Sequence, residues 1–313
     1  EVSGQVYQFA GDTNQALATY NKLANLLPNN PQPYLRIADI HLAAKNKQAA
    51  RESLAKGLNK QPDSLPLQRA KIMMDMADGR FSDALTTAQA IKKAQPSESA
   101  GYVLEGDIHL AQKDWKEAAT AYRAGLKAAP TTDLARRLYI ALLQSGQTAE
   151  AASTIDTWIK AHPNDQAFRL FVADTANKRK DYATAVAHYR AALAIAPKNP
   201  AILNNLAWSL GQMHDPKAMA YAEEANTLAP NQPEIMETLG SLYVTQGKLA
   251  PGIDLLAKAV SLAPQNPDIR LSYAKALIKA GKKTEAKQAL DTLAKLGDKF
   301  SAHAEVVELS KGL

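Results

Sequence analysis

Prolines recur at nearly constant intervals along this chain of 313 residues. Eight of them, spaced 33 or 34 residues apart, are Pro28, Pro62, Pro96, Pro130, Pro163, Pro197, Pro230 and Pro264. Because a proline lacks the backbone donor and its ring clashes with the preceding helical turn, each of these residues marks the end of a helix. A fixed period of this length indicates a stack of repeats, each built from two helices.

Small and apolar side chains recur in phase with the prolines. With each proline counted as position 32 of its unit, position 20 is small in every unit: Ala16, Ala50, Ala84, Ala118, Ala151, Ala185, Ala218, Gly252 and Ala286. Position 24 carries Tyr20, Leu54, Tyr122, Ile155, Tyr189, Leu256 and Leu290, with Ala88 and Ala222 as weaker members. Position 8 is small at Gly4, Ala38, Gly106, Ala173, Ala207, Gly240 and Ala274. Small residues let two helices cross closely, so these positions predict the buried contacts of each pair.

The turn inside each predicted pair is also marked. It begins with a glycine or a short polar run at Lys45, Gly79, Lys113, Gly146, Lys180, His214, Gly247 and Gly281. Glycine tolerates the left-handed backbone conformation that ends a helix, which explains its recurrence there. The units ending at Pro163 and Pro230 are one residue short, so positions in their first helices are fixed only to within one residue.

The composition favours helix-on-helix packing and excludes several function classes. Hydrophobic residues make up 46% of the chain and aromatic residues 6%, and β-branched residues are too sparse for a substantial sheet. The chain has no cysteine, which excludes disulfides, thiolate metal sites and cysteine nucleophiles within it. Its net charge of +6 comes from basic residues interspersed with carboxylates, so we expect no nucleic-acid partner. No apolar run is long enough to span a bilayer.

These features resemble the tetratricopeptide repeat (TPR) family over essentially the whole chain. The resemblance implies an all-α fold, a right-handed α-α superhelix, over residues 1–297. A truncated first repeat covers residues 1–28, and further repeats end near 62, 96, 130, 163, 197, 230, 264 and 297. Residues 298–313 are expected to form a capping helix that buries Ala304, Val307 and Leu309. The methionine-rich helix at 67–77 is expected to pack irregularly, because Lys71 and Ile72 depart from the family pattern.

The last third has a closer resemblance. The segments Leu203-Asn204-Asn205-Leu206-Ala207-Trp208, Asp215-Pro216-Lys217-Ala218, Glu237-Thr238-Leu239-Gly240 and Lys279-Ala280-Gly281 look like the PEP-CTERM system TPR-repeat lipoproteins (PrsT). That family implies a periplasmic, outer-membrane-anchored protein that accompanies exosortase and exopolysaccharide export. The lipobox cysteine would precede this chain, so contact with a membrane is expected only through a lipid anchor outside it. The cytoplasm is the alternative compartment.

Candidate catalytic and metal-binding motifs are weak. Ser53–Lys56 and Ser272–Lys275 have the Ser-x-x-Lys spacing of serine acyltransferases, but neither has a companion motif. The histidines are scattered, and His41 and His109 occupy position 11 of two units, which points them into the packing between helices. We therefore expect no enzyme activity, no cofactor and no metal.

The family geometry places positions 2, 5, 9, 12 and 13 of each first helix on a concave binding face. The candidate binding residues there are Asp39, Arg69, Asp107, Asp174, Asn204, Asn205 and Trp208. An exposed Trp208 beside two asparagines could hold a peptide or a sugar ring, whereas the alternative is that it packs against a neighbouring helix. Asp174 and Glu234 argue against a clamp for a peptide carboxylate, because they would repel it.

Together these patterns predict a non-catalytic protein–protein interaction scaffold that assists exopolysaccharide export and PEP-CTERM/exosortase-linked sorting. Protein or peptide segments are the expected partners, with polysaccharide-export machinery among them. A peptide-binding TPR adaptor of another pathway and an accessory repeat region of a larger enzyme are the two alternatives.

Overall fold

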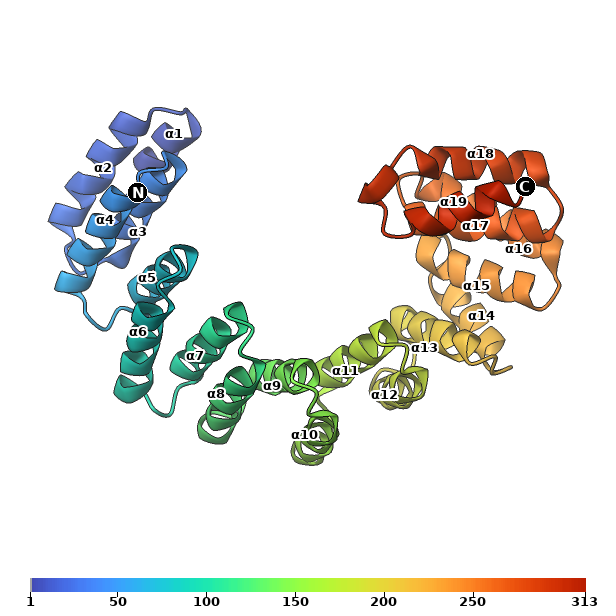
Figure 1. Cartoon of the computed structure of the whole chain (residues 1–313), viewed down its shortest axis with the longest axis horizontal. Helices are drawn as coiled ribbons and strands as arrows, with labels where there is room; N and C mark the ends of the chain where they lie inside the picture. The colour runs from blue at the N-terminus through green and yellow to red at the C-terminus, as the bar shows by residue number, and fades with distance from the viewer. Residues whose placement is uncertain (1) are drawn as a thin grey trace. The chain divides into compact units, whose positions relative to one another are not determined.

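The computed structural model describes residues 2–313, which form α-helices, one short 3₁₀ helix and no β-strand over that range (Figure 1). The predicted all-α solenoid of helix pairs is confirmed. The helices are α1 (Val2–Phe9), α2 (Thr13–Leu26), α3 (Pro31–Ala43), α4 (Lys47–Lys60), α5 (Leu65–Ala77), α6 (Phe81–Ala94), α7 (Ser99–Ala111), α8 (Trp115–Ala128), α9 (Thr132–Gln144), α10 (Thr148–Ala161), α11 (Gln166–Lys178), α12 (Tyr182–Ile195), α13 (Pro200–Gln212), α14 (Ala218–Leu228), α15 (Pro233–Thr245), α16 (Leu249–Leu262), α17 (Pro267–Lys279), α18 (Lys283–Ala294), η1 (Gly297–Lys299) and α19 (His303–Lys311).

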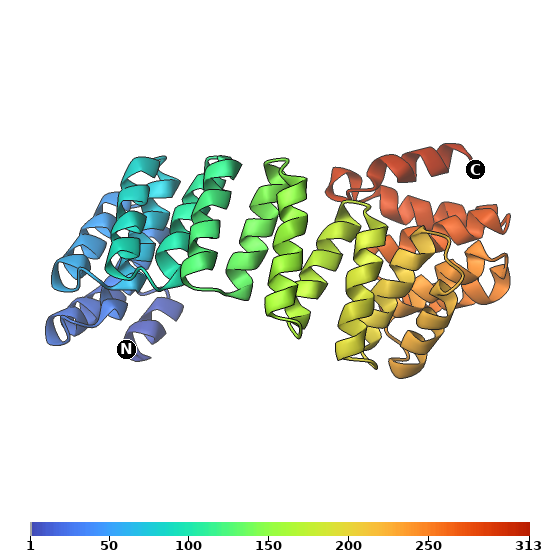
Figure 2. The same cartoon turned by 90° about the horizontal axis from the view of Figure 1, so that it is seen from below.

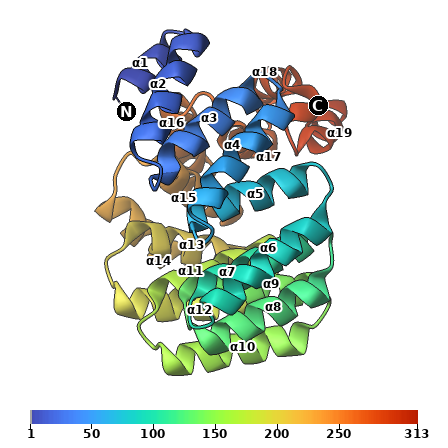
Figure 3. The same ribbon diagram turned by 90° about the vertical axis from the view of Figure 1, so that its left-hand side faces the viewer.

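The chain divides into two compact units, Glu1–Ala161 and His162–Leu313. Within each unit the two helices of a pair run antiparallel side by side, and each pair packs on the next in chain order (Figure 2). The same succession along α5, α6, α7 and α8 of the first unit can be followed in Figure 3. The boundary falls between α10 and α11, where one predicted repeat ends and another begins.

Each of the periodic prolines follows the end of a helix, as the sequence predicts. In all eight cases the second helix of a pair ends two residues before the proline, as α2 does at Leu26 and α16 does at Leu262. The intervening residue has left the helical region: φ is −129° and ψ is 66° at Leu27, the residue before Pro28. A residue that precedes proline is forced toward extended ψ values by the proline ring, which explains this sharp end.

The turn within each pair has one conformation throughout. Nine residues at equivalent places have left-handed φ values of 56° to 83°: Gly11, Lys45, Gly79, Lys113, Gly146, Lys180, His214, Gly247 and Gly281. The backbone N–H that follows each of the nine donates to the carbonyl five residues back, as Asn46 N does to His41 O at 2.8 Å. This pattern is the Schellman helix end, and four of the nine sites adopt it without glycine.

The core of each pair lies at the predicted small and apolar positions. The residues at positions 20 and 24 are all buried, among them Ala118 and Tyr122 at 0% exposure. Gly106 supplies the closest approach, because a Cβ there would lie 2.2 Å from Cε1 of Tyr122. Absence of a side chain at Gly106 therefore makes the space that the Tyr122 ring fills.

The C-terminal segment differs from its prediction in one respect. A 3₁₀ turn at Gly297–Lys299 precedes the final helix, which begins only at His303. Its buried residue is Val306 at 0% exposure, whereas Ala304 and Val307 are exposed and Leu309 is half-buried. The predicted buried face was therefore wrong, because the turn shifts the rotational register in which α19 meets α18. Phe300, at the end of the 3₁₀ turn, fills the remaining space against the cluster at Leu290 and Leu293.

Candidate functional site

A groove of about 440 Å³ lies in the second unit along the first helices of three consecutive pairs, α11, α13 and α15, with Tyr189 of α12 at its base. We call it the Trp208 groove. The residues that line it are Asp174, Asn177, Lys178, Tyr189, Asn204, Asn205, Trp208, Glu234, Glu237 and Thr238. It therefore brings together four of the seven predicted binding residues, Asp174, Asn204, Asn205 and Trp208.

Trp208 is held in place by an aromatic contact, and part of the residue remains accessible to solvent. The indole meets the ring of Tyr182 edge to face, with ring centroids 5.8 Å apart and planes at 73°. The residue is still 36% exposed. Trp208 therefore packs against Tyr182 of the neighbouring helix α12 and also borders the groove, so it has features of both the packing and the binding interpretation.

Asp174 belongs to a hydrogen-bond network that fixes the floor of the groove. The Tyr189 hydroxyl donates to Asp174 Oδ1 at 2.5 Å and accepts from Asn177 Nδ2 at 3.2 Å. Ser209 Oγ donates to Asn177 Oδ1 at 3.0 Å. Burial, and then the hydrogen bond to Asp174, raise the pKa of the Tyr189 phenol, so the phenol stays neutral and donates its proton.

Asn204 has an unmet hydrogen-bonding group in this groove. Its Oδ1 atom is shielded from solvent and has no hydrogen-bond partner among residues 2–313. A buried acceptor without a donor costs free energy in the unliganded protein. This cost favours any rotation of the Asn204 carboxamide that brings the oxygen to a donor in the groove.

Glu237 borders both the Trp208 groove and a second cavity of about 490 Å³ between α13, α15 and α17. Its Oε1 accepts a hydrogen bond from Ser272 Oγ at 2.6 Å. Burial raises the pKa of the Glu237 carboxyl, and the negative charges of Asp268 and Glu234 add to the rise. Two lysines line the second cavity, but Lys275 pairs with Glu305 at 2.7 Å and Lys279 donates to Val244 O at 2.8 Å.

The other three predicted residues lie in the first unit, outside the Trp208 groove. Asp39 is exposed, with Arg36 Nη1 3.9 Å from its carboxylate, and Arg69 is exposed. Asp107 accepts from the Tyr122 hydroxyl at 2.6 Å and pairs with Arg137. The carboxylate of Asp107 thus has a structural role, in tying α7 to α8 and α9.

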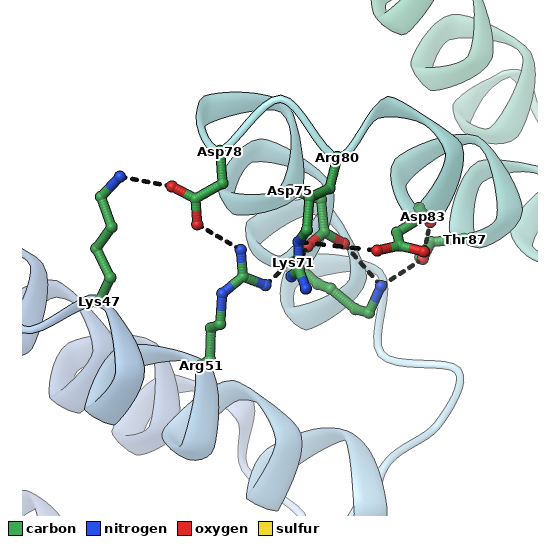
Figure 4. A network of polar contacts seen from close by, with 8 residues as sticks. All are labelled: Lys47, Arg51, Lys71, Asp75, Asp78, Arg80, Asp83 and Thr87. Atoms are coloured by element: carbon green, nitrogen blue, oxygen red, sulfur yellow. Dashed lines mark hydrogen bonds and ion pairs between the residues drawn. The ribbon is translucent and has the colours of Figure 1, made fainter.

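A buried polar network in the first unit was not predicted (Figure 4). Asp75 on α5 is 0% exposed and accepts from Arg51 Nη1 and Lys71 Nζ, both at 2.8 Å, and from Arg80. Asp78 continues the network through Arg51 at 2.6 Å and Lys47 at 2.5 Å. The network joins α4 of one pair to α5 and α6 of the next. The sequence does contain a sign of this network, because Asp75 occupies position 11 of its repeat, where the repeats before and after have His41 and His109.

Several other chemistries have no support in the described part of the chain. Ser53 Oγ donates to Tyr34 O at 2.8 Å, so that hydroxyl is engaged in packing α4 on α3. Residues 2–313 contain no group of three or more histidine, aspartate or glutamate side chains arranged to hold a metal ion. Over the same range, no helix is both long enough and apolar enough to cross a membrane.

The repeat geometry and comparisons with known families define the class of protein. Two family models, each described as tetratricopeptide repeat, match residues 10–74 and 245–307 and residues 75–132 and 137–200. The chain belongs to the tetratricopeptide repeat family, whose repeats act as protein–protein interaction scaffolds. The TPR resemblance inferred from the sequence is thereby confirmed.

The chain is similar to parts of longer proteins. It is 27% identical over 315 residues to cellulose synthase operon protein C of Pseudomonas fluorescens, a match that covers 90% of this chain and 24% of that protein. It is 23% identical to BBSome complex member BBS4 of Bos taurus, over 62% of this chain and 38% of that protein. The fold resembles Cut9 in the crystal structure of the APC/C hetero-tetramer Cut9-Hcn1, with a TM-score of 0.50, 15% identity, and coverage of 95% and 58%. The chain thus spans about a quarter to two fifths of the length of these curated relatives.

Proposed function

We propose that this chain is a non-catalytic scaffold that binds a segment of a partner protein along the first helices of its second unit. The observation that carries the proposal is the Trp208 groove, where an accessible indole, three asparagines and three carboxylates line one cavity. Flat aromatic faces beside hydrogen-bonding groups are typical of surfaces that hold polypeptide segments.

We further propose that the scaffold works in the periplasm, in exopolysaccharide export, within a longer lipid-anchored protein. The support is the similarity to cellulose synthase operon protein C over 90% of this chain. The narrower link to PEP-CTERM proteins and exosortase is supported by the resemblance of residues 203–281 to the PrsT family.

Site-specific photo-crosslinking tests the scaffold proposal. A photoreactive amino acid at Asn205, inside the groove, should capture a discrete partner in cells that make the full-length protein. The same amino acid at Glu224, an exposed position on α14, the second helix of the same pair, is the matched control. Equal capture from both positions, or from neither, contradicts binding in the groove.

The export role is tested by gene deletion. Loss of the gene should reduce secreted exopolysaccharide, and the wild-type gene should restore it whereas one encoding Trp208→Ala should restore it only partly. A full-length gene without a signal peptide and lipobox cysteine would rule out the periplasmic assignment.

A peptide-binding adaptor of another pathway is the second candidate. It is favoured by the similarity to BBSome complex member BBS4, which is a subunit of a protein assembly. The crosslinked partner separates the two candidates, because a component of export machinery supports the first and an unrelated protein supports the second.

A further inference from the structure

We propose that the Trp208 groove binds the side chain of a lysine or arginine on an extended segment of a partner polypeptide. This inference rests on the proposed scaffold function and names the chemistry that the groove selects. It is carried by three independent features of the groove: its unpaired carboxylates, an acceptor that lacks a donor, and the position of the indole.

Carboxylates outnumber cations among the residues that line the groove. Asp174 is partnered by the Tyr189 hydroxyl and Glu237 by the Ser272 hydroxyl, and Glu234 is exposed at the first turn of α15. Among residues 2–313, none of the three forms an ion pair, whereas Asp75, Asp78 and Asp107 each pair with an arginine. Lys178 is the one cation among the residues lining the groove. The groove therefore carries an excess of negative charge that a cationic side chain would neutralise.

The unpartnered oxygen of Asn204 also favours a ligand that carries hydrogen-bond donors. Oδ1 of Asn204 is a shielded acceptor without a donor, so a change of the Asn204 rotamer that turns this oxygen into the groove would let a donor on the ligand satisfy it. Ammonium and guanidinium groups are donors without acceptor lone pairs, so they suit this oxygen and the carboxylates together. A peptide carboxylate would meet an acceptor and several negative charges, which disfavours it.

The indole of Trp208 gives the groove an aromatic surface that can attract a cation. It borders the same groove as the carboxylates, and its ring is fixed by the contact with Tyr182. A cation close to the face of a tryptophan is attracted by the ring quadrupole, and tryptophan is the most favourable residue for this contact. A neutral sugar could stack on the same ring, but it would leave the carboxylates without a counter-charge, so the charge distribution favours the basic side chain.

The test begins with a random nonapeptide library displayed on phage and selected on the full chain. The enriched peptides are synthesised, and each lysine is replaced by norleucine or each arginine by citrulline. We expect enrichment of a basic residue, loss of affinity of about ten-fold on its replacement, and weaker binding at higher salt. Titration of Trp208 fluorescence, in a chain whose other two tryptophans are replaced by phenylalanine, reports occupancy of the groove itself.

Variants of the chain provide the second arm. Asp174→Asn keeps an oxygen that can accept from Tyr189 but removes the charge, and Glu234→Gln does the same on α15. Together they should weaken binding of the selected peptide about ten-fold, with Glu224→Gln, exposed in mid-α14, as the matched control. Asn204→Leu should weaken binding while raising Tm, because the unpartnered oxygen is removed; a merely structural asparagine would lower Tm instead.

The outcomes separate the two proposals. Peptides that bind equally well after norleucine or citrulline replacement, or that bind the Asp174→Asn/Glu234→Gln variant unchanged, overturn the basic side chain but leave the scaffold function intact. Failure to enrich any peptide, together with failure of the Asn205 crosslink, overturns both. Binding of a neutral oligosaccharide such as cellohexaose at Trp208, unaffected by the carboxylate variants, also overturns this inference.

Discussion

Individual residues in this solenoid are under backbone constraints that the repeat imposes at equivalent places. Lys45, Lys113 and Lys180 adopt φ values near 60°, where five other repeats have glycine. For a residue with a Cβ this conformation costs about 1–2 kcal/mol, since the Cβ approaches the following carbonyl oxygen. The strain is confined to one residue, and the hydrogen bonds of each Schellman turn hold that residue in the left-handed conformation.

Replacing Lys113 with glycine should therefore stabilise the protein. The expected gain is about 0.5–1 kcal/mol, because relief of the left-handed strain exceeds the larger entropy that glycine has in the unfolded chain. Chemical denaturation in urea measures it. Gly146→Ala is the reciprocal control: a Cβ there meets no atom within 4 Å, yet φ is 77°, so it should destabilise. A Lys113→Gly variant no more stable than wild type would show that the turn carries no strain.

Gly106 is constrained by the space around it and not by its backbone conformation. Gly106→Ala should destabilise the first unit by about 1–3 kcal/mol, because the new methyl overlaps the Tyr122 ring. Tyr122→Leu in the same chain should recover part of the loss, since two other repeats combine alanine and leucine at these positions, Ala38 with Leu54 and Ala274 with Leu290. Equal stabilities of Gly106→Ala and wild type in thermal unfolding would contradict the packing.

Glu237 makes stability depend on pH. A carboxyl whose pKa is raised in the folded state binds more protons there than in the unfolded chain, so its contribution is present below its ordinary value of 4.5 and is lost as pH rises through the folded pKa. Glu237→Gln should gain unfolding free energy relative to wild type between pH 4 and pH 7, while the amide still accepts from Ser272. Paired urea titrations at the two pH values measure the change. A constant difference would show that the pKa of Glu237 is the same in both states.

At the scale of single helices, α19 covers the open face of the last pair. Val306 and Phe300 pack on Leu271, Leu290 and Leu293, and the next residue, Val307, is 37% exposed. A terminal helix of this kind has one apolar face and otherwise polar surroundings, which suits the end of a stack of repeats. The apolar contact of α19 is therefore narrow and depends on few side chains.

A charge on that contact should release the helix. Val306→Asp should destabilise the C-terminal end by on the order of 3 kcal/mol, since an unpaired carboxylate cannot be buried there. Val307→Asp, one residue away and exposed, should change stability by less than about 0.5 kcal/mol. Hydrogen–deuterium exchange at α18 and α19 distinguishes the two variants. Equal protection in both would contradict the burial of Val306, and loss of protection in Val307→Asp alone would show that Val307 is the buried residue.

At the scale of the whole molecule, each pair of helices packs mainly on its neighbours in sequence, so stability is local to each unit. The Asp75 network is a polar link of this kind, because it connects α4, α5 and the start of α6 through one buried carboxylate (Figure 4). Disruption in one unit should therefore leave the other largely protected.

Asp75→Ala tests that expectation. It should destabilise the first unit by on the order of 3 kcal/mol, moderated because its three cationic partners are partly exposed and can be hydrated. Asp83→Ala, which removes an exposed partner 3.7 Å from Arg80, should cost less than about 1 kcal/mol. Hydrogen exchange should rise in residues 2–161 and stay unchanged in 162–313. A uniform rise across both ranges would contradict independent units.

The repeat, its helix ends and its buried small residues could be derived from the sequence, because each depends on short-range physics. A proline beyond the first helical turn stops a helix, glycine relieves a left-handed turn, and a small residue such as Ala118 is needed where two helices cross closely. The relation between neighbouring pairs could not be derived in this way, because it depends on a small rotation between repeats that the 34-residue period does not specify. That rotation brings Arg51 to Asp75 and gathers Asp174, Asn204 and Trp208 from two helices into one groove. The period also does not specify the 3₁₀ turn before α19, which buries Val306 instead of Val307.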